Sequence, residues 1–226
     1  NYYSAIELIK KLQTTKTVTT VVINYRRLQE LLSAGNWKAA DRETFAIMLK
    51  IAGREKQGYL SAVDIKNIPC IHLHVIDQLW VVYSNGLFGF SVQKHIWQSL
   101  EGTNKSALTT WCDFCNCVGW RLKDSGHYWG WIPYDRLAFS LNSPVGNLPV
   151  ALPGKGYSLK LILLYLVFTL LACTIVFLLL DTQVNKFILV TIGATIFYLY
   201  QMCNDNQKYT SQWWKHLFSR LENCEL

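Results

Sequence analysis

Two long apolar runs dominate the second half of the chain. Residues 161–180 and residues 187–204 contain no charged side chain. At the helical rise of about 1.5 Å per residue, each run is long enough to cross the hydrocarbon core of a bilayer once. The polar residues 181–186 between them predict a turn. We therefore expect a two-helix transmembrane hairpin over residues 158–204. Because it contains no histidine to ligate a pigment metal, we interpret it as an anchor.

The basic residues near the hairpin predict its orientation, because Lys and Arg are enriched on the cytoplasmic side of membrane spans. The connecting turn has only Lys186, whereas the flanking segments carry Lys155, Lys160, Lys208, Lys215 and Arg220. We expect a multi-pass membrane protein whose soluble part and tail both face the cytoplasm, or the stroma if the compartment is a plastid.

The tail, residues 205–226, has an amphipathic pattern of its own. Helical spacing places its large apolar side chains on one face: Trp213, Trp214, Leu217, Phe218 and Leu221. A face with two tryptophans is typical of a helix that lies in the membrane interface. Docking of the same face on a partner protein is the alternative.

The first 153 residues show the period of helices rather than the alternation of strands. The apolar positions predict helices over residues 1–12, 25–35, 37–53, 75–83 and 91–100. Ser91 is expected to cap the last of these, and Ser61 with Asp64 forms a capping box for a further short helix that ends at Pro69. We expect an all-α protein with an N-terminal helix and linker (residues 1–23) and a helical domain (residues 24–153).

Composition and charge narrow the class of protein. The 226 residues are 51% hydrophobic and 16% charged, against about 25% charged in an average soluble domain. The net charge of +7 is spread along the chain, with only short basic pairs, so nucleic acid is not an expected partner. Seven cysteines, among them Cys173 inside an apolar run, fit a reducing compartment better than a secreted disulfide framework.

Several stretches of the helical domain resemble a known family. They are residues 37–44 (WKAADRET), 76–97 (IDQLWVVYSNGLFGFSVQKHIW), 118–121 (VGWR) and the spaced pattern of residues 131–149. The match resembles the tetrapyrrole-binding domain of the genomes-uncoupled type (fourth member), the porphyrin-binding activators of magnesium chelatase. The resemblance implies a compact, all-helical, cupped-hand fold that binds protoporphyrin IX or Mg-protoporphyrin IX and has no catalysis of its own. A chlorophyll-type pigment is the alternative ligand.

The resemblance also implies a setting and partners. The expected partner is the large subunit of magnesium chelatase, and the expected location is a plastid thylakoid or a cyanobacterial membrane. A different class of function remains open at this point. The chain is alternatively an accessory structural subunit of a photosystem or antenna complex, in which the hairpin and tail dock and porphyrin binding is weakened or lost.

A porphyrin is a flat apolar disc with two propionates, so its site requires aromatic walls and one or two cations. Trp120, Trp129 and Trp131 lie in glycine-rich sequence where a core helix would not need them, and Arg121 and Arg136 are the propionate candidates, with surface ion pairs as the alternative. The complete expected site comprises Phe88, Phe90, Val92, Ile96, Trp97, Trp120, Arg121, Trp129, Trp131, Tyr134, Arg136 and Phe139.

Two local features depart from the family pattern. Asn147 stands where the motif has a histidine. The cluster of Cys112, Cys115 and Cys117 with His127 downstream is a weak alternative zinc site, and free thiols in a loop are the other interpretation. Asp41, Arg42 and Glu43 point in different directions on a helix, so we interpret them as solvated or capping groups. The sequence contains no nucleophile elbow, phosphate-binding loop or dinucleotide fingerprint.

Overall fold

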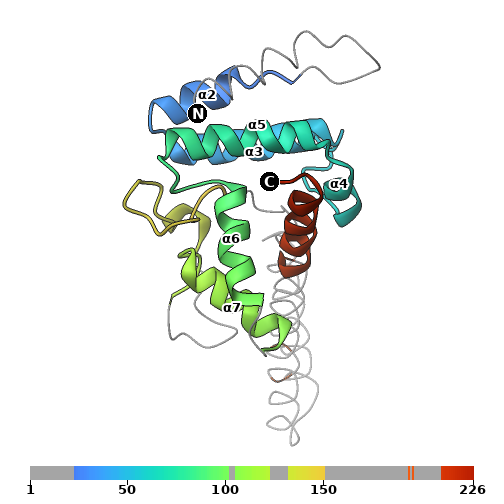
Figure 1. The fold of residues 1–226 in the computed structure, drawn as a ribbon, viewed down its shortest axis with the longest axis vertical. Helices are drawn as coiled ribbons and strands as arrows, with labels where there is room; N and C mark the ends of the chain where they lie inside the picture. Colours follow the sequence, from blue (N-terminus) through green and yellow to red (C-terminus); the bar gives the residue numbers. More distant parts are fainter. Residues whose placement is uncertain (1–22, 102–104, 123–131, 151–192, 194, 196–209) are drawn as a thin grey trace, which may run out of the picture. The chain divides into compact units, whose positions relative to one another are not determined.

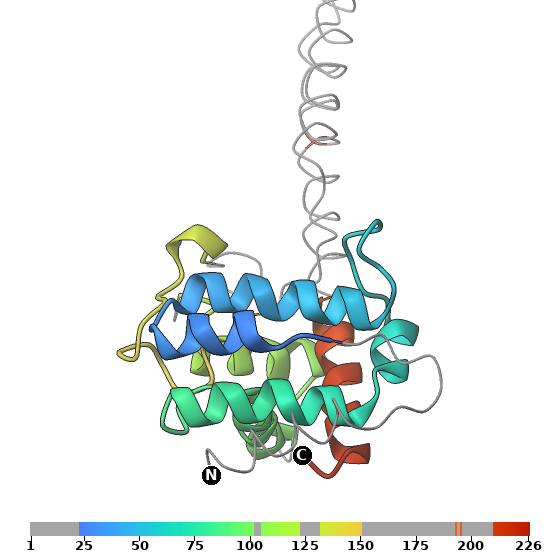
Figure 2. The same cartoon turned by 90° about the horizontal axis from the view of Figure 1, so that it is seen from above.

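Helices α3 (Trp37–Ile51) and α5 (Cys70–Tyr83) form the centre of the fold. The computed structural model describes residues 23–101, 105–122, 132–150, 193, 195 and 210–226. The chain divides into a first unit, Asn1–Gly154 with Ser211–Leu226, and a second unit, Lys155–Thr210. Within the first unit, α2 (Arg26–Ser33) packs on both α3 and α5, and α6 (Phe90–Glu101) extends from them on the opposite side (Figure 1 and Figure 2).

The first two helices of the described residues, α2 and α3, form where the apolar spacing predicts them. Leu28, Leu31 and Leu32 are buried along one face of α2. Gly35, at a φ of +66°, lets the chain turn back without the steric penalty of a Cβ. Asn36 then caps α3, because its side-chain oxygen accepts the backbone N–H of Ala39.

The predicted capping box and the short helix that follows it are also confirmed. The Ser61 side chain accepts the Asp64 backbone N–H, and the Asp64 carboxylate accepts the Ser61 backbone N–H, at the start of α4 (Ala62–Asn67). Helix α5 begins at Cys70, five residues before the predicted helix. Buried side chains lie on several sides of this helix, and they include its own Leu73, Ile76 and Trp80. A helix without a polar face lacks the amphipathic stripe on which the sequence prediction depends.

The start of α6 differs from the prediction that Ser91 caps it. The helix begins at Phe90, and its cap comes from α5, because the Ser91 backbone N–H donates to Asp77 Oδ1 at 2.8 Å. Asp77 is 1% exposed, and burial raises the pKa of its carboxyl group, an effect opposed by hydrogen bonds from Ser91 and Phe90. A buried side chain distant in sequence therefore satisfies the helix terminus.

The segment with the cysteine cluster is a helix rather than a loop. Helix α7 (Ala107–Cys117) starts after Ser106, whose hydroxyl accepts the backbone N–H of Thr109. It buries Trp111 and Phe114 against α6. Cysteines and aromatic residues are only moderate helix formers, so their spacing gives a weak helical signal in isolation.

The C-terminal helix (residues 210–223) lies against the helical domain, which corrects the expectation that its apolar face rests in a membrane interface. Its five large apolar side chains, from Trp213 to Leu221, are each no more than 3% exposed. Beyond the helix, Cys224 forms a disulfide with Cys70 at the start of α5, with a Cα–Cα distance of 5.2 Å. This bond is also a correction, because the sequence indicates reduced cysteines.

Two predicted segments fall outside the described residues. They are the N-terminal helix and linker up to residue 22 and, apart from Gly193 and Thr195, the transmembrane hairpin at residues 158–204. Within the part of the chain that the structure does describe, no helix has both the length and the apolar character of a membrane span.

Candidate functional site

Two aromatic rings and two cations meet at the surface of α3. The Tyr134 and Phe139 rings are in edge-to-face contact, with centroids 5.2 Å apart. Lys38 Nζ lies 5.8 Å from the Tyr134 centroid and 5.3 Å from that of Phe139, and the Arg42 guanidinium carbon lies 5.9 Å from the Tyr134 centroid. These are cation–π distances. We call Lys38, Arg42, Tyr134 and Phe139 the basic aromatic platform.

The platform is fixed from below by a buried carboxylate. Tyr134 follows Pro133 in a short 3-10 turn, η1 (Tyr134–Arg136), and its hydroxyl donates to Asp41 Oδ2 at 2.7 Å. Asp41 Oδ1 accepts the backbone N–H of Val150 at 2.6 Å. Asp41 is 2% exposed, so it is not the solvated group that the sequence indicates. Burial and the nearby Asp41 charge raise the pKa of Tyr134, which therefore stays protonated as a donor.

The platform has the chemistry for a flat, anionic, aromatic ligand. Lys38 and Arg42 are four residues apart on α3 and so share a face. Arg42 is exposed, and Lys38 and the two rings are half-buried, so both apolar surface and positive charge reach solvent. Arg136, one of the two propionate candidates predicted from the sequence, is exposed on η1. Three of the predicted site residues, Tyr134, Arg136 and Phe139, thus belong to or adjoin this surface.

A second group of predicted residues lies inside the protein. Trp97 and Trp120 join Trp111 and Phe114 of α7 in a set of touching rings, which we call the aromatic cluster. Phe90 is also buried, and its ring contacts Trp214 of the C-terminal helix. The Trp97–Phe114 and Phe114–Trp120 centroid distances are 5.8 and 5.6 Å. Each of these rings is at most 5% exposed. Rings at such distances are in direct contact, so the cluster has no room for a porphyrin disc between them.

The remaining predicted residues are scattered. Phe88 packs on Trp37 and Trp80 between α3 and α5, with centroid distances of 5.5 and 6.3 Å, and serves the core. Val92 and Ile96 are half-buried on α6. Trp129 and Trp131 lie outside the described residues.

Arg121, the other propionate candidate, is 5% exposed and sits beside Cys112. Burial raises the pKa of the Cys112 thiol, and the Arg121 charge partly opposes that rise. An enclosed guanidinium beside a buried thiol is poorly placed for a ligand in solvent. Within the described residues, the cations available to a propionate at this site therefore come from α3 and η1.

Asn147, the departure from the family motif, has a structural role. Its side-chain amide N–H donates to the Val118 backbone carbonyl at 2.7 Å, and the Asn147 backbone carbonyl accepts the Trp120 indole N–H at 2.8 Å. Asn147 is 1% exposed. The residue therefore fixes the chain after α7 and orients Trp120.

The alternative zinc site finds no support in the described part of the chain, where no group of three potential ligands converges. Cys112 and Cys115 are buried, whereas Cys117 is exposed on another side of α7. Burial raises the pKa of the Cys115 thiol well above its ordinary value, which disfavours the thiolate that binds zinc. The fourth expected ligand, His127, lies outside the described residues.

The sequence could not identify two parts of the site. Lys38 and Arg42 have the spacing of a shared helix face, but they lie almost 100 residues before the rings that they approach, as the contact between Lys38 and the Asp135 carbonyl illustrates. The packing of the C-terminal helix against the aromatic cluster is equally long-range, with Trp120 and Trp214 centroids 5.0 Å apart.

Comparison with known proteins gives a consistent set of relatives. A family model described as GUN4-like matches residues 18–163. The ycf53 protein of Porphyra purpurea is 39% identical over 102 residues, which are 44% of this chain and 40% of that protein. The chloroplastic tetrapyrrole-binding protein of Arabidopsis thaliana is 37% identical over 76 residues, 33% of this chain and 29% of that protein.

This chain spans about half or less of the length of the curated relatives it matches. Among solved structures, it is similar to GUN4 from Chlamydomonas reinhardtii, at 28% identity and a TM-score of 0.47, over 62% of this chain and 88% of the other.

Proposed function

The chain belongs to the GUN4-like family, and on that premise we propose that it binds a tetrapyrrole, protoporphyrin IX or its magnesium form, as a carrier and regulator rather than as an enzyme. The name of the Arabidopsis relative supports this ligand class. We further propose that the protein supports magnesium chelatase in chlorophyll synthesis. On the basis of its two uncharged apolar runs, we propose that the hairpin predicted at residues 158–204 anchors the protein in a plastid thylakoid or cyanobacterial membrane.

The observation that carries the proposal is the basic aromatic platform. A tetrapyrrole presents a wide apolar face and two propionates, and binding both requires aromatic surface beside cations. Tyr134 and Phe139 provide the rings, with centroids 5.2 Å apart, and Lys38 and Arg42 provide the charges, each within 5.9 Å of the Tyr134 centroid. Charge-assisted hydrogen bonds from these cations to propionates are stronger than neutral ones.

The aromatic cluster adds to this site only when it is accessible. Trp97 and Trp120, which the aromatic pattern of the sequence predicts as site residues, are 4% and 5% exposed. The C-terminal helix covers both, with Phe218 against Trp97 and Trp214 against Trp120. In this arrangement, the ligand contacts the platform, and the cluster remains part of the protein interior.

The proposal is tested by titrating the purified full chain with protoporphyrin IX and following tryptophan emission. We expect Arg42→Gln and Lys38→Gln each to weaken binding about tenfold, the value of one charge-assisted contact. Lys50→Gln is the matched control, since Lys50 is exposed at the other end of the same helix. Equal affinity in all four proteins would remove the platform from the site.

The covering of Trp97 and Trp120 favours one alternative, a structural subunit with weakened porphyrin binding. Purification of the native membrane form separates the two functions. Recovery with a chelatase subunit and bound tetrapyrrole supports the carrier. Recovery with a photosystem or antenna complex, and without protoporphyrin IX or its magnesium form, supports the structural subunit.

A further inference from the structure

The C-terminal helix packs over the aromatic cluster and covers it from solvent. Phe218 packs against Trp97 and Phe114 at centroid distances of 5.6 and 5.5 Å. Trp214 packs against Trp120 at 5.0 Å. Without this helix, the indole rings of Trp97 and Trp120 would lose their outer neighbours and form an open aromatic surface between α6 and α7.

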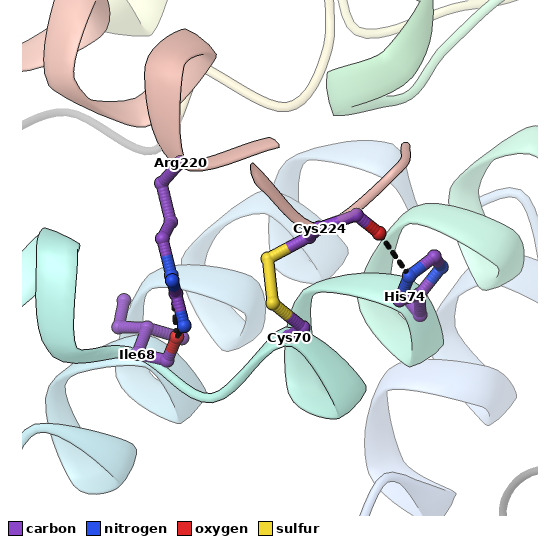
Figure 3. Close-up of a disulfide and its surroundings, with 5 residues drawn as sticks. All are labelled: Ile68, Cys70, His74, Arg220 and Cys224. Carbon is purple, nitrogen blue, oxygen red and sulfur yellow. Dashed lines mark hydrogen bonds between the residues drawn. A yellow bond between two sulfur atoms is a disulfide. The ribbon is translucent and has the colours of Figure 1, made fainter. Parts of the chain in front are cut away.

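The C-terminal end of this helix is held against α5 and the residues just before α5 by one disulfide and a few polar contacts (Figure 3). The Cys70–Cys224 disulfide links residues 154 positions apart in sequence. Beside it, the Arg220 guanidinium donates to the Ile68 carbonyl at 2.9 and 3.0 Å, and the His74 ring contacts the Cys224 carbonyl at 2.7 Å. The residues that make these polar contacts lie within five positions of Cys70 or Cys224 in the sequence.

The docked helix also contains two poorly satisfied groups. The indole N–H groups of Trp213 and Trp214 are buried and find no hydrogen-bond acceptor among the residues that the structure describes. A buried donor without an acceptor loses its hydrogen bond to water and gains nothing in return. Release of the helix restores that bond for both indoles, so the docked state carries a penalty that the open state lacks.

We propose that the Cys70–Cys224 disulfide is a redox clasp: a dithiol reductant opens it, and the freed C-terminal helix then uncovers Trp97 and Trp120 for the tetrapyrrole. This inference rests on the proposed function for its ligand, but the clasp itself does not. It assigns a regulatory modification site to a pair of cysteines and gives the covered part of the predicted site a way to become accessible.

The reaction is a thiol–disulfide exchange. Cys70 is partly exposed whereas Cys224 is 5% exposed, so the reductant's thiolate attacks the Cys70 sulfur and the Cys224 thiolate leaves. The second thiol of the reductant attacks the mixed disulfide, which leaves two protein thiols and an oxidised dithiol. Two electrons pass to the protein, and two protons accompany them to the sulfurs.

The clasp controls the helix because it limits how far the chain can move. While the bond is closed, the end of the helix cannot leave α5, whatever the state of the other contacts. After reduction, departure depends only on apolar packing and polar contacts.

Amide hydrogen exchange of the full chain tests the clasp without any ligand. We expect exchange in residues 211–226 to be at least about tenfold faster after treatment with dithiothreitol, because a cross-link suppresses opening by that much or more. Reoxidation should restore slow exchange. Cys70→Ser should exchange fast under both conditions, and Cys117→Ser, which removes an exposed free thiol, should respond like the wild type. Equal exchange in the oxidised and reduced wild type would overturn the proposal.

Titration with protoporphyrin IX in both redox states tests what the clasp controls. Reduction should tighten binding about tenfold, in step with the greater population of the open state. Faster exchange with unchanged affinity would overturn control of ligand access and leave the proposed function intact. Faster exchange without protoporphyrin binding in either state would establish the clasp and count against the proposed function.

Discussion

Gly89 and Asp77 together determine how α6 begins. Gly89 has a φ of +143°, and a Cβ at this position would lie 2.8 Å from both Asp77 Oδ1 and a methyl group of Val81. The same Asp77 oxygen accepts the Ser91 N–H. The absence of a side chain at residue 89 thus lets a buried carboxylate reach the start of a helix.

We predict that Gly89→Ala lowers the free energy of unfolding by about 2 kcal/mol more than Gly58→Ala, because a clash is added to the backbone strain. Gly58 is the matched control, since its φ is also positive, at +70°, but no atom lies near its Cβ position. Urea denaturation measures both variants. Equal losses would show that α5 and α6 are not packed this closely.

His72 makes the stability of the domain depend on pH. Its ring is 5% exposed and hydrogen-bonded to the Tyr25 hydroxyl, and burial lowers the pKa of His72 below 6.5. The unfolded chain therefore binds a proton near pH 6.5 that the folded chain accepts only at lower pH. Stability then rises with pH across this window, by at most about 1.4 kcal/mol per pH unit for one group.

The corresponding prediction compares urea denaturation at pH 5.5 and pH 7.5. His72→Gln should reduce the stability gained between the two pH values, because it removes the group that titrates in the unfolded chain. His95→Gln, at an exposed position of α6, should leave that gain unchanged. An unaltered gain in His72→Gln would mean that the ring is protonated in the folded protein.

At the scale of the elements, the C-terminal helix acts as part of the core. Leu217 and Leu221 are 0% exposed and Trp214 is 1% exposed. The sequence pattern identifies this apolar face correctly but not the surface that it meets. An amphipathic helix has the same periodicity whether it faces lipid, a partner or its own domain.

We predict that Phe218→Ala and Trp214→Ala each lower the free energy of unfolding by about 3–5 kcal/mol, as truncation of large core side chains does. Lys215→Ala, on the exposed side of the same helix, should change it by less than about 0.5 kcal/mol. Thermal and chemical denaturation of the full chain provide the values. If the two aromatic variants instead lost vesicle binding at unchanged stability, the helix would belong to the membrane interface.

The other elements show what local sequence can and cannot predict. Helices α2 and α3 and the α4 capping box follow from spacing and caps within a few residues, and all three are confirmed. The cap of α6 comes from Asp77, 14 residues before Ser91, and the prediction of a local cap is wrong for that reason. Helix α7 is missed because its cysteines and tryptophan have no strong local preference.

At the scale of the whole molecule, the family follows from the aromatic and glycine motifs, but the site does not. Tyr134 and Phe139 are predicted, whereas Lys38 and Arg42 come from a helix almost 100 residues away. The Cys70–Cys224 pairing spans 154 residues and leaves no trace in local spacing. Contacts of this range depend on the packing of the entire domain, which a single sequence does not reveal.

The domain thus combines an accessible basic aromatic platform with an aromatic cluster held shut by its own C-terminal helix. The proposed function requires that this domain binds a tetrapyrrole. The most direct test is gel filtration of the purified full chain with protoporphyrin IX, followed by absorbance at the porphyrin band. We predict that porphyrin elutes with the protein at about one molecule per chain and shifts its absorbance maximum. Elution of all porphyrin apart from the protein, in both the oxidised and the reduced state, would rule out tetrapyrrole binding by this domain.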